Sequence, residues 1–376
     1  MKNQSIELFI KKLMNDTKDP GKPAWNMEVL RAGKENRWNY IDGCMLTSLI
    51  ALYEETKNKE YLDFVISYVD HYVNEDGVIL GYDPTHYSTD DLSESRILFD
   101  LYKYTKNEKY LKAIELSYSQ IANHPRTNAG NFWHKKIYHD QVWLDGLYMI
   151  QPFYTRYNTQ FNKKEDYKDT LNQFKNVRAL MFDEDKKLYY HAYDESKSLF
   201  WANKKTGLSK HFWLRAIGWY AASLADVAYY MEDSEGKKYL ASLLKETIDG
   251  LLQYQDPKTK MFYQIVDLGT REKNYLESSG SALIAYAILK ATNNNLLDAS
   301  YKQIGLDIFN GICTNFLTDT NGDLNLENIC LVAGVGPESN PRRDGSYEYY
   351  MSEPIVKNDA KGVGPLIMAY SEVIKA

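Results

Sequence analysis

The sequence Leu52-Tyr-Glu-Glu-Thr-Lys-Asn-Lys-Glu-Tyr-Leu62 recurs 49 positions later as Leu101-Tyr-Lys-Tyr-Thr-Lys-Asn-Glu-Lys-Tyr-Leu111, with seven of the eleven positions identical. In each copy an apolar segment ends at a short polar turn, and an amphipathic segment begins at the Tyr-Leu pair. Self-similarity at such a period is typical of a repeated supersecondary unit, here a pair of helices. Weaker echoes of the second helix start occur at Asp166-Tyr167, Lys238-Tyr239-Leu240 and Ser300-Tyr301.

Six apolar segments indicate helices that are covered on most sides: Ile41–Glu55, Leu92–Tyr104, Val142–Arg156, Leu214–Met231, Ser281–Ala291 and Gly364–Ile374. Partner segments such as Tyr61–Tyr72, Tyr110–Ile121 and Tyr239–Tyr254 are amphipathic, with Lys and Glu on the outer side. Six buried helices alternating with outer helices predict an all-α (α/α)6 barrel, formed by residues 1–376 as a single domain. We expect Ser5–Asn15 to pack outside the C-terminal helix and close the ring.

The residues just before each inner helix are expected to meet at one end of this barrel. They are rich in aromatic rings, carboxylates and amides: Trp38–Tyr40, Thr89–Asp91, Gln141–Trp143, His211–Trp213, Glu277–Ser279 and Asp359–Lys361. Four long connections are predicted on the same side: Asn123–His139, Phe182–Leu208, Lys258–Tyr275 and Leu317–Val356. Within them, Phe182–Phe200 and Met261–Gly269 predict short hairpins that line a cleft. This end of the barrel is therefore the predicted functional face.

Composition excludes several classes of function. The net charge of −6 argues against a nucleic-acid surface, which needs a basic stripe. No run of residues approaches a membrane span, and no secretory signal is recognisable. Three cysteines at unrelated spacings form neither a disulfide framework nor a metal knuckle, so we expect a reduced, cytoplasmic protein. No metal-ligand or nucleotide motif is present, and we expect a monomer that uses no cofactor.

Two acidic residues are the first candidates for chemistry. Asp145 lies in the apolar and aromatic run Gln141–Met149, and partial desolvation there would raise the pKa of its carboxyl group. A helix N-terminus is the alternative explanation for an Asp at that place. Asp90 precedes the second inner helix and is either its N-cap or a second carboxylate beside the same opening. Asp91 is interpreted as the solvent-facing neighbour.

A second group consists of an arginine between two indoles. Arg215 and Trp219 are four residues apart and share one helical face, with Trp213 just before them. An Arg held this way can bind a planar anion such as a uronate carboxylate, or it can be a structural Arg stacked on core aromatics. His191, in the aromatic segment Leu188–Asp194, is weak evidence by itself.

Several motifs in this order resemble glycoside hydrolase family 105, the unsaturated rhamnogalacturonyl hydrolases. The resemblance covers most of the chain and is carried by Phe132–Lys135, Gln141–Met149, Leu188–Asp194, Phe212–Trp219, Arg343–Tyr350, Ser352–Pro354 and Lys361–Pro365. It implies an (α/α)6 barrel, Asp145 as the catalytic general acid and base, and Asp90 as its partner carboxylate. It also implies substrate-binding roles, with Trp213, Arg215 and Trp219 shaping the uronate pocket; the full set is His191, Trp213, Arg215, Trp219, Trp143, His134 and Tyr40.

The resemblance further implies an unusual reaction on a small oligosaccharide, an unsaturated uronyl-rhamnose disaccharide produced by a lyase. Protonated Asp145 would donate its proton to C4 of the C4=C5 double bond, and water would add at C5. The resulting hemiketal opens with loss of the leaving sugar. Asp90 would keep Asp145 protonated by like-charge repulsion, whereas a nearby Arg215 would lower its pKa. We therefore expect the Arg215 guanidinium to point at the substrate and away from Asp145.

Other functions remain open from the sequence. The related unsaturated glucuronyl hydrolases act on other lyase products by the same chemistry. A sugar 2-epimerase on this fold would need paired histidines, for which His191 and His211 are the candidates. A non-catalytic sugar-binding protein would tolerate replacement of Asp145 by Asn.

Overall fold

The repeated turn builds its first helical hairpin from local caps. The structure is a computed structural model that describes residues 2–375. Helix α3 (Tyr40–Thr56) ends where Lys57 adopts a left-handed conformation with φ 57°. The Asn58 side chain then accepts a hydrogen bond of 3.1 Å from the backbone N–H of Glu60 and starts α4 (Lys59–Asp70).

The second copy repeats this geometry. Helix α6 (Arg96–Thr105) ends at Lys106, which has φ 57°. Asn107 accepts a 3.1 Å hydrogen bond from the N–H of Lys109 at the start of α7 (Glu108–Asn123). The two identical Thr-Lys-Asn turns therefore reverse the chain by the same mechanism, because both the left-handed residue and the cap are specified locally.

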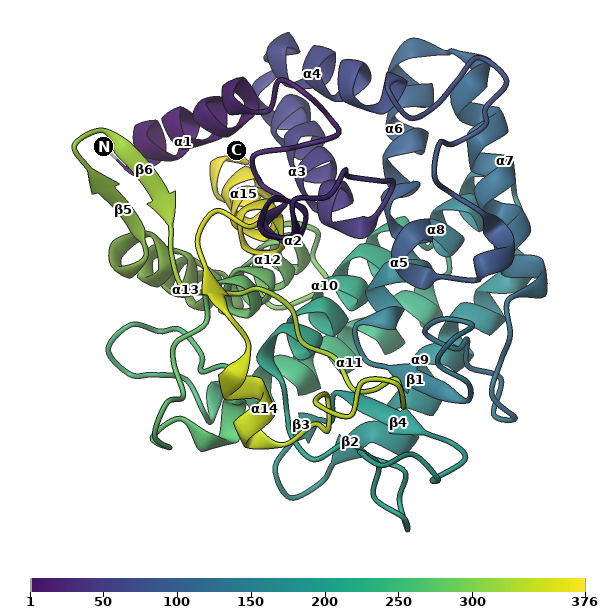
Figure 1. Cartoon of the computed structure of the whole chain (residues 1–376), viewed down its shortest axis with the longest axis vertical. Helices are drawn as coiled ribbons and strands as arrows, with labels where there is room; N and C mark the ends of the chain where they lie inside the picture. Colours follow the sequence, from purple (N-terminus) through teal and green to yellow (C-terminus); the bar gives the residue numbers. More distant parts are fainter. Residues whose placement is uncertain (1, 376) are drawn as a thin grey trace.

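Five helical hairpins, together with α15 and α1 from the two ends of the chain, form a closed double ring (Figure 1). The inner ring contains α3, α5 (Thr89–Glu94) with α6, α8 (Gly146–Gln160), α10 (Leu214–Tyr230), α12 (Ser278–Asn293) and α15 (Ala360–Ile374). The outer helices are α4, α7, α9 (Tyr167–Met181), α11 (Ser234–Leu252), α13 (Tyr301–Asn315) and α1 (Lys2–Asp16). Helix α15 packs against both α12 and α3, which closes the inner ring. The predicted (α/α)6 barrel is confirmed.

The N-terminal helix completes the outer ring. In α1, Ile6, Phe9 and Ile10 are fully buried. The Tyr370 hydroxyl of α15 donates a hydrogen bond of 3.1 Å to Glu7 Oε1 of α1. The prediction that Ser5–Asn15 packs outside the C-terminal helix is therefore confirmed.

The bounds of every inner helix differ from the prediction, with α15 starting at Ala360 and not at Gly364, and two of the predicted segments also differ in structure. The prediction of helix from Val142 was wrong, because Gln141–Trp143 forms strand β1, which pairs antiparallel with β4 (Ala192–Asp194). The second inner helix is interrupted at Ser95, whose N–H bonds to Leu92 O, three residues back, at 3.0 Å. This tighter turn separates α5 from α6.

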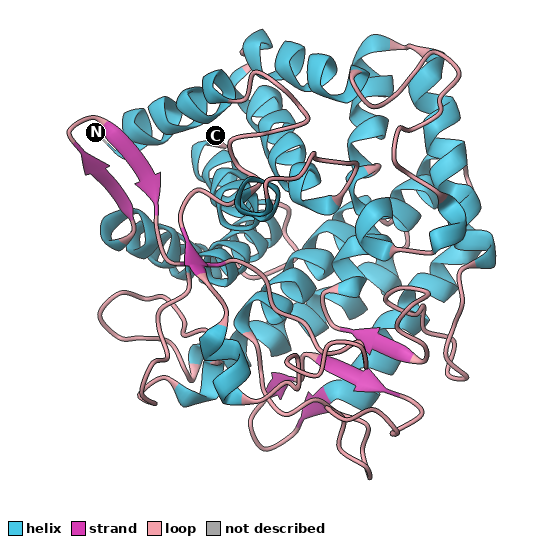
Figure 2. Cartoon of the chain, in the orientation of Figure 1, coloured by secondary structure: helices cyan, strands magenta, loops and turns pink. Residues whose placement is uncertain are grey.

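Short elements cover the end of the barrel where the inner helices begin, and Figure 2 shows strands at the edge of the helical ring and one in front of it. They are α2 (Met27–Ala32), α14 (Tyr347–Ser352), the 3₁₀ turns Pro84–His86 and Val266–Leu268, and three further strand pairs; a third 3₁₀ turn, Lys164–Asp166, joins α8 to α9 at the opposite end. Those pairs are β2 (Phe182–Asp183) with β3 (Leu188–Tyr189), β5 (Leu317–Thr320) with β6 (Asp323–Leu326), and β7 (Ile329–Cys330) with β8 (Ile355–Val356). The hairpin predicted within Phe182–Phe200 is present as β2–β3, but it does not line the cleft at this end of the barrel as predicted. The one predicted within Met261–Gly269 is not present, because those residues form the turn Val266–Leu268 and isolated bridges.

Among residues 2–375, no helix is long and apolar enough to cross a membrane.

We predict that Asn107→Ala lowers the free energy of unfolding by about 1 kcal/mol, because the cap of α7 loses its acceptor. Asn107→Asp keeps an acceptor oxygen and should retain most of that stability. Urea denaturation of the two variants and the wild type measures the difference. Equal stability of the Ala and Asp variants would contradict this account of the turn.

Candidate active site

A cleft of about 450 Å³ opens at the end of the barrel where the inner helices begin. One wall is the N-terminal segment 26–41, which includes α2, and the facing wall is the loop 332–343. The starts of α5 and α8 form the floor. Figure 1 shows α2 lying in front of α3 and α15. The repeated turns lie at the other end of the barrel, where α3 and α6 end.

Asp145 lies at the junction between β1 and α8. Its backbone occupies the N-cap position of α8, but its side chain makes no capping hydrogen bond. The residue is 8% exposed, and its Oδ1 atom is buried without a hydrogen-bond partner among the described residues. The carboxyl group therefore reaches the cleft with little solvation, which disfavours its ionised form.

Asp90 reaches the same cleft from the first turn of α5. Its Oδ2 atom lies 2.5 Å from Lys135 Nζ, and its Oδ1 atom lies 3.5 Å from His134 Nε2. Both partners come from the connection between α7 and β1. Asp90 is thus a paired carboxylate, whereas no ion pair is formed by Asp145 among the described residues.

The two carboxyl groups have opposite pKa shifts. Burial, followed by the charge of Asp90, raises the pKa of Asp145 to about 7, against smaller opposing effects that include Arg215 and Lys135. Burial would also raise the pKa of Asp90, but Lys135 and His134 together lower it below the usual value. One acid is therefore available as a proton donor near neutral pH beside a permanent negative charge.

Aromatic rings surround this pair. Trp143 stacks on His134 with ring centroids 4.3 Å apart and an interplanar angle of 8°. Burial lowers the pKa of His134 to about 4, so this imidazole is neutral near pH 7. The Cβ that any residue other than Gly would add at Gly146 would lie 3.0 Å from His134 Nδ1, so glycine lets the ring approach α8. Tyr40, at the start of α3, also lines the cleft.

The structure thus brings five of the nine predicted site residues to the cleft: Tyr40, Asp90, His134, Trp143 and Asp145. His191 does not line it. Burial lowers the pKa of His191 to about 3, and its Nδ1 atom lies 2.7 Å from the Tyr350 hydroxyl. His211, the other histidine considered for an epimerase, does not line the cleft either.

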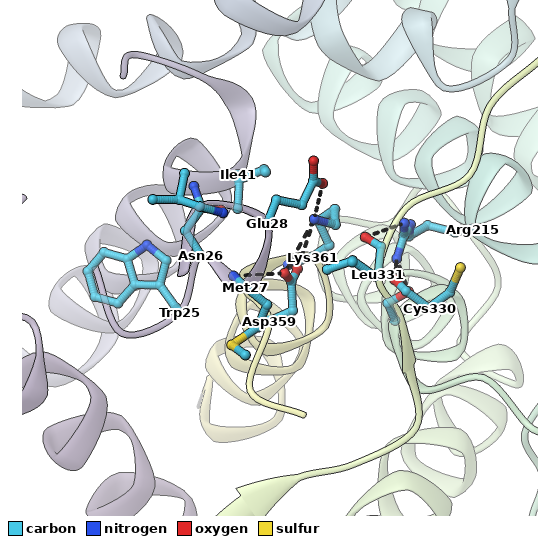
Figure 3. Close-up of polar contacts among 12 residues, drawn as sticks. Trp25, Asn26, Met27, Glu28, Ile41, Arg215, Cys330, Leu331, Asp359 and Lys361 are labelled. Carbon is cyan, nitrogen blue, oxygen red and sulfur yellow. Dashed lines mark hydrogen bonds and ion pairs between the residues drawn. The ribbon is translucent and has the colours of Figure 1, made fainter. Parts of the chain in front are cut away.

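The arginine group is arranged differently from the prediction. Arg215 is 1% exposed, and its guanidinium donates to the backbone carbonyl oxygens of Cys330 and Leu331 and to Ser279 Oγ (Figure 3). The expectation that it points at the substrate is therefore not met. Trp213 donates from Nε1 to Gln264 Oε1 at 3.2 Å, and Trp219 stacks on Tyr148 inside the ring at 4.5 Å. None of the three lines the cleft.

Asp91 also differs from the prediction. We expected it to face solvent, but it is 6% exposed, and its Oδ2 atom accepts a hydrogen bond of 3.2 Å from Arg37 Nη1. The helix α5 points Asp90 and Asp91 to different partners, and only Asp90 contacts Lys135.

Sequence reasoning missed a cluster that fixes the cleft wall. Lys361 Nζ, fully buried at the start of α15, lies 2.7 Å from Glu28 Oε1 of α2 and 3.1 Å from Asp359 Oδ1 (Figure 3). Asp359 also accepts a 3.3 Å hydrogen bond from the Met27 backbone N–H. Lys135 and Arg343 were missed as well, although both lie in motifs that carry the family resemblance. Nothing in those motifs indicated that Lys135 pairs with Asp90 or that Arg343 lines the cleft.

The described residues contain no group of three or more His, Cys, Asp or Glu side chains arranged to hold a metal ion. What the cleft offers is a neutral carboxylic acid, a fixed carboxylate and flat aromatic walls. Such an arrangement suits proton transfer to a ring-shaped polar substrate.

Comparisons with known proteins agree with this geometry. The family model described as Glycosyl Hydrolase Family 88 matches residues 8–376. A solved glycoside hydrolase from family 105, from C. acetobutylicum, is 41% identical with a TM-score of 0.88, covering 96% of this chain and 98% of that one. A curated relative, "Unsaturated rhamnogalacturonyl hydrolase YesR" of Bacillus subtilis, is 27% identical over 68% of this chain and 71% of its own length.

The fold is shared more widely. The unsaturated glucuronyl hydrolase structure from Bacillus sp. GL1 has a TM-score of 0.67 at 13% identity, covering 98% of this chain and 96% of that one. At this identity the similarity concerns the fold alone.

We predict that Asp145→Asn stabilises the protein at pH 8 and does so less and less as the pH falls toward 4. Between pH 4 and pH 7 the folded wild type keeps a proton on Asp145 that the unfolded chain has released, so rising pH destabilises the wild type. The stability gained by the variant should therefore grow by up to about 1.4 kcal/mol per pH unit in that interval. Urea denaturation across pH measures it.

Asp90→Asn is the matched comparison, because it removes the ionised partner of Lys135 and should destabilise the protein at neutral pH. A difference between Asp145→Asn and the wild type that is the same at every pH would contradict the raised pKa of Asp145.

Proposed function

The chain belongs to Glycosyl Hydrolase Family 88 and to glycoside hydrolase family 105, and we propose that it removes the terminal 4,5-unsaturated galacturonyl residue from rhamnogalacturonan lyase products. The reaction is an acid-catalysed hydration of the C4=C5 double bond. The observation that carries this proposal is the pair of neighbouring acids, one with its pKa raised to about 7 and one with its pKa lowered, on the floor of one cleft.

The first step uses the proton of Asp145. An enol ether accepts a proton at its β carbon, which here is C4, and the positive charge then develops on C5 and the ring oxygen. The C4–H bond forms as the O–H bond of Asp145 breaks. Asp90, kept ionised by Lys135, supplies a fixed negative charge that stabilises the cation. No covalent bond between sugar and protein is needed.

The second step returns the proton. Water adds to C5 and loses a proton to the Asp145 carboxylate, which restores the starting acid. The product is a hemiketal at C5 that opens to a ketone and releases the leaving sugar from C1. One residue thus acts first as acid and then as base, which explains why only one of the two acids has a raised pKa.

The leaving sugar is the finer part of the proposal. The name of the Bacillus subtilis relative supports a rhamnogalacturonan product. The alternative is a lyase product derived from glucuronate. Because the double bond removes the stereocentre at C4, galacturonate and glucuronate give the same unsaturated ring. Discrimination must then come from the part of the cleft that holds the leaving sugar.

We predict that the wild type abolishes the ultraviolet absorption of the conjugated uronate in rhamnogalacturonan lyase digests, and that Asp145→Asn slows this at least about 1,000-fold by removing the proton donor. Asp140→Asn is a matched control: it lies five residues upstream, has φ 57°, which Asn tolerates, and does not line the cleft. It should retain activity.

Reaction in heavy-oxygen water separates hydration from ordinary hydrolysis. Before the carbonyl oxygens of the product exchange with solvent, the label should appear at uronate C5, and initial label on the uronate anomeric carbon would exclude the mechanism. Persistence of the absorption band with wild type on both galacturonate- and glucuronate-derived substrates would reject the proposed activity. A non-catalytic sugar-binding protein would give that result.

A second prediction concerns pH. The value of kcat/KM should fall as the pH rises through about 7, where Asp145 of the free enzyme loses its proton. In Asp90→Asn the residual activity should decline at a lower pH, because removal of the neighbouring negative charge lowers the pKa of Asp145. An unchanged upper limb in this variant would show that Asp90 does not set the protonation of Asp145.

A further inference from the structure

The cationic side chains around the cleft differ in what they already bind. Lys135 is paired with Asp90, and Arg37 donates to Asp91. Arg215, close by, is occupied by backbone carbonyl oxygens. Lys34 lies exposed at the rim. Arg343 remains, and it lines the cleft with no ion pair among the described residues.

The backbone of Arg343 is fixed by hydrogen bonds, whereas its side chain keeps a donor without a hydrogen-bond partner among the described residues. Its backbone carbonyl accepts a 2.8 Å hydrogen bond from Gly336, and its N–H donates to Asn340 O at 3.1 Å. Its Nε atom is buried and has no hydrogen-bond partner among the described residues. A buried donor without a partner is unfavourable, and an incoming acceptor would relieve that cost.

The guanidinium lies beside the aromatic wall of the cleft. A Cβ added at Gly334 would lie 2.9 Å from the Trp143 ring and 3.2 Å from Arg343 Nη1, so both groups flank the same glycine. Trp143 is two residues from Asp145 and stacks on His134. Arg343 therefore presents its donors next to the ring system that surrounds the acid.

We propose that Arg343 binds the carboxylate of the unsaturated uronyl group. A planar guanidinium matches a planar carboxylate through two parallel N–H···O bonds, and a bound carboxylate supplies the acceptor that Nε lacks. This inference depends on the proposed function, which supplies the uronate. It gives Arg343 the role that the sequence pattern suggested for Arg215.

The binding is expected to act on substrate affinity more than on the chemical step. The uronate carboxylate keeps its charge from bound substrate to cation and product, so the pairing stabilises each state similarly. Arg343→Ala should raise KM about 10- to 100-fold, with kcat changed by no more than about threefold. Arg343→Lys keeps the charge without the fork and should recover only part of the affinity.

The neighbouring arginine provides the control. Arg342 has a side chain that is 51% exposed and pairs with Glu353 at 2.9 Å. Arg342→Ala should leave KM unchanged. Because the Arg343 side chain makes no ion pair among the described residues and its Nε has no hydrogen-bond partner there, Arg343→Ala should also keep the thermal midpoint of the wild type.

A second substrate separates binding from structure. The methyl ester of the unsaturated uronide lacks the anionic carboxylate, and its different intrinsic reactivity cancels when the acid-to-ester ratio of kcat/KM is compared between enzymes. This ratio should be about 10- to 100-fold lower in Arg343→Ala than in wild type and unchanged in Arg342→Ala. Equal losses on acid and ester, or an unchanged KM, would overturn the assignment. Inactivity of the wild type itself would instead reject the proposed function.

Discussion

The ion pair between Lys135 and Asp90 determines the charge of the whole site. With Nζ 2.5 Å from the carboxylate, Asp90 stays ionised although it is buried. Burial, and after it the fixed charge of Asp90, raises the pKa of Asp145, which forms no ion pair among the described residues. Without the lysine, two neighbouring carboxyl groups would titrate as a coupled pair and neither would have a defined role. Lys135 and His134 beside Asp90, and burial of Asp145, thus give two chemically identical side chains the different roles of counter-ion and proton donor.

Contacts between the N-terminal and C-terminal parts of the chain hold one wall of the cleft around this pair. Lys361, at the start of the last inner helix, holds Glu28 of the N-terminal wall, and Asp359 holds the Met27 backbone (Figure 3). The start of α15, the helix that closes the inner ring, therefore also holds the N-terminal wall of the cleft. The buried ammonium costs desolvation, which two carboxylates offset.

The sequence predicted what local rules determine. The repeated polar turn and the apolar helix pattern were enough to predict the barrel, because local caps at Asn58 and Asn107 form that turn, and the placement of Asp90 and Asp145 at helix starts brought them to one cleft. Nonlocal partners accounted for the errors. Residues 141–143 pair as a strand with 192–194, and Arg215 binds carbonyl groups more than 110 residues away in the chain. Neither partner is visible in a helical pattern.

The acids lie at helix starts, whereas the facing walls of the cleft come from segment 26–41 and loop 332–343. This division has an evolutionary consequence. Substitutions and length changes in the walls can reshape the space for the departing sugar without shifting the β1–β4 register that fixes Asp145. Related enzymes with this fold can therefore evolve to release different sugars through changes in these loops, while the acid that donates the proton keeps its position.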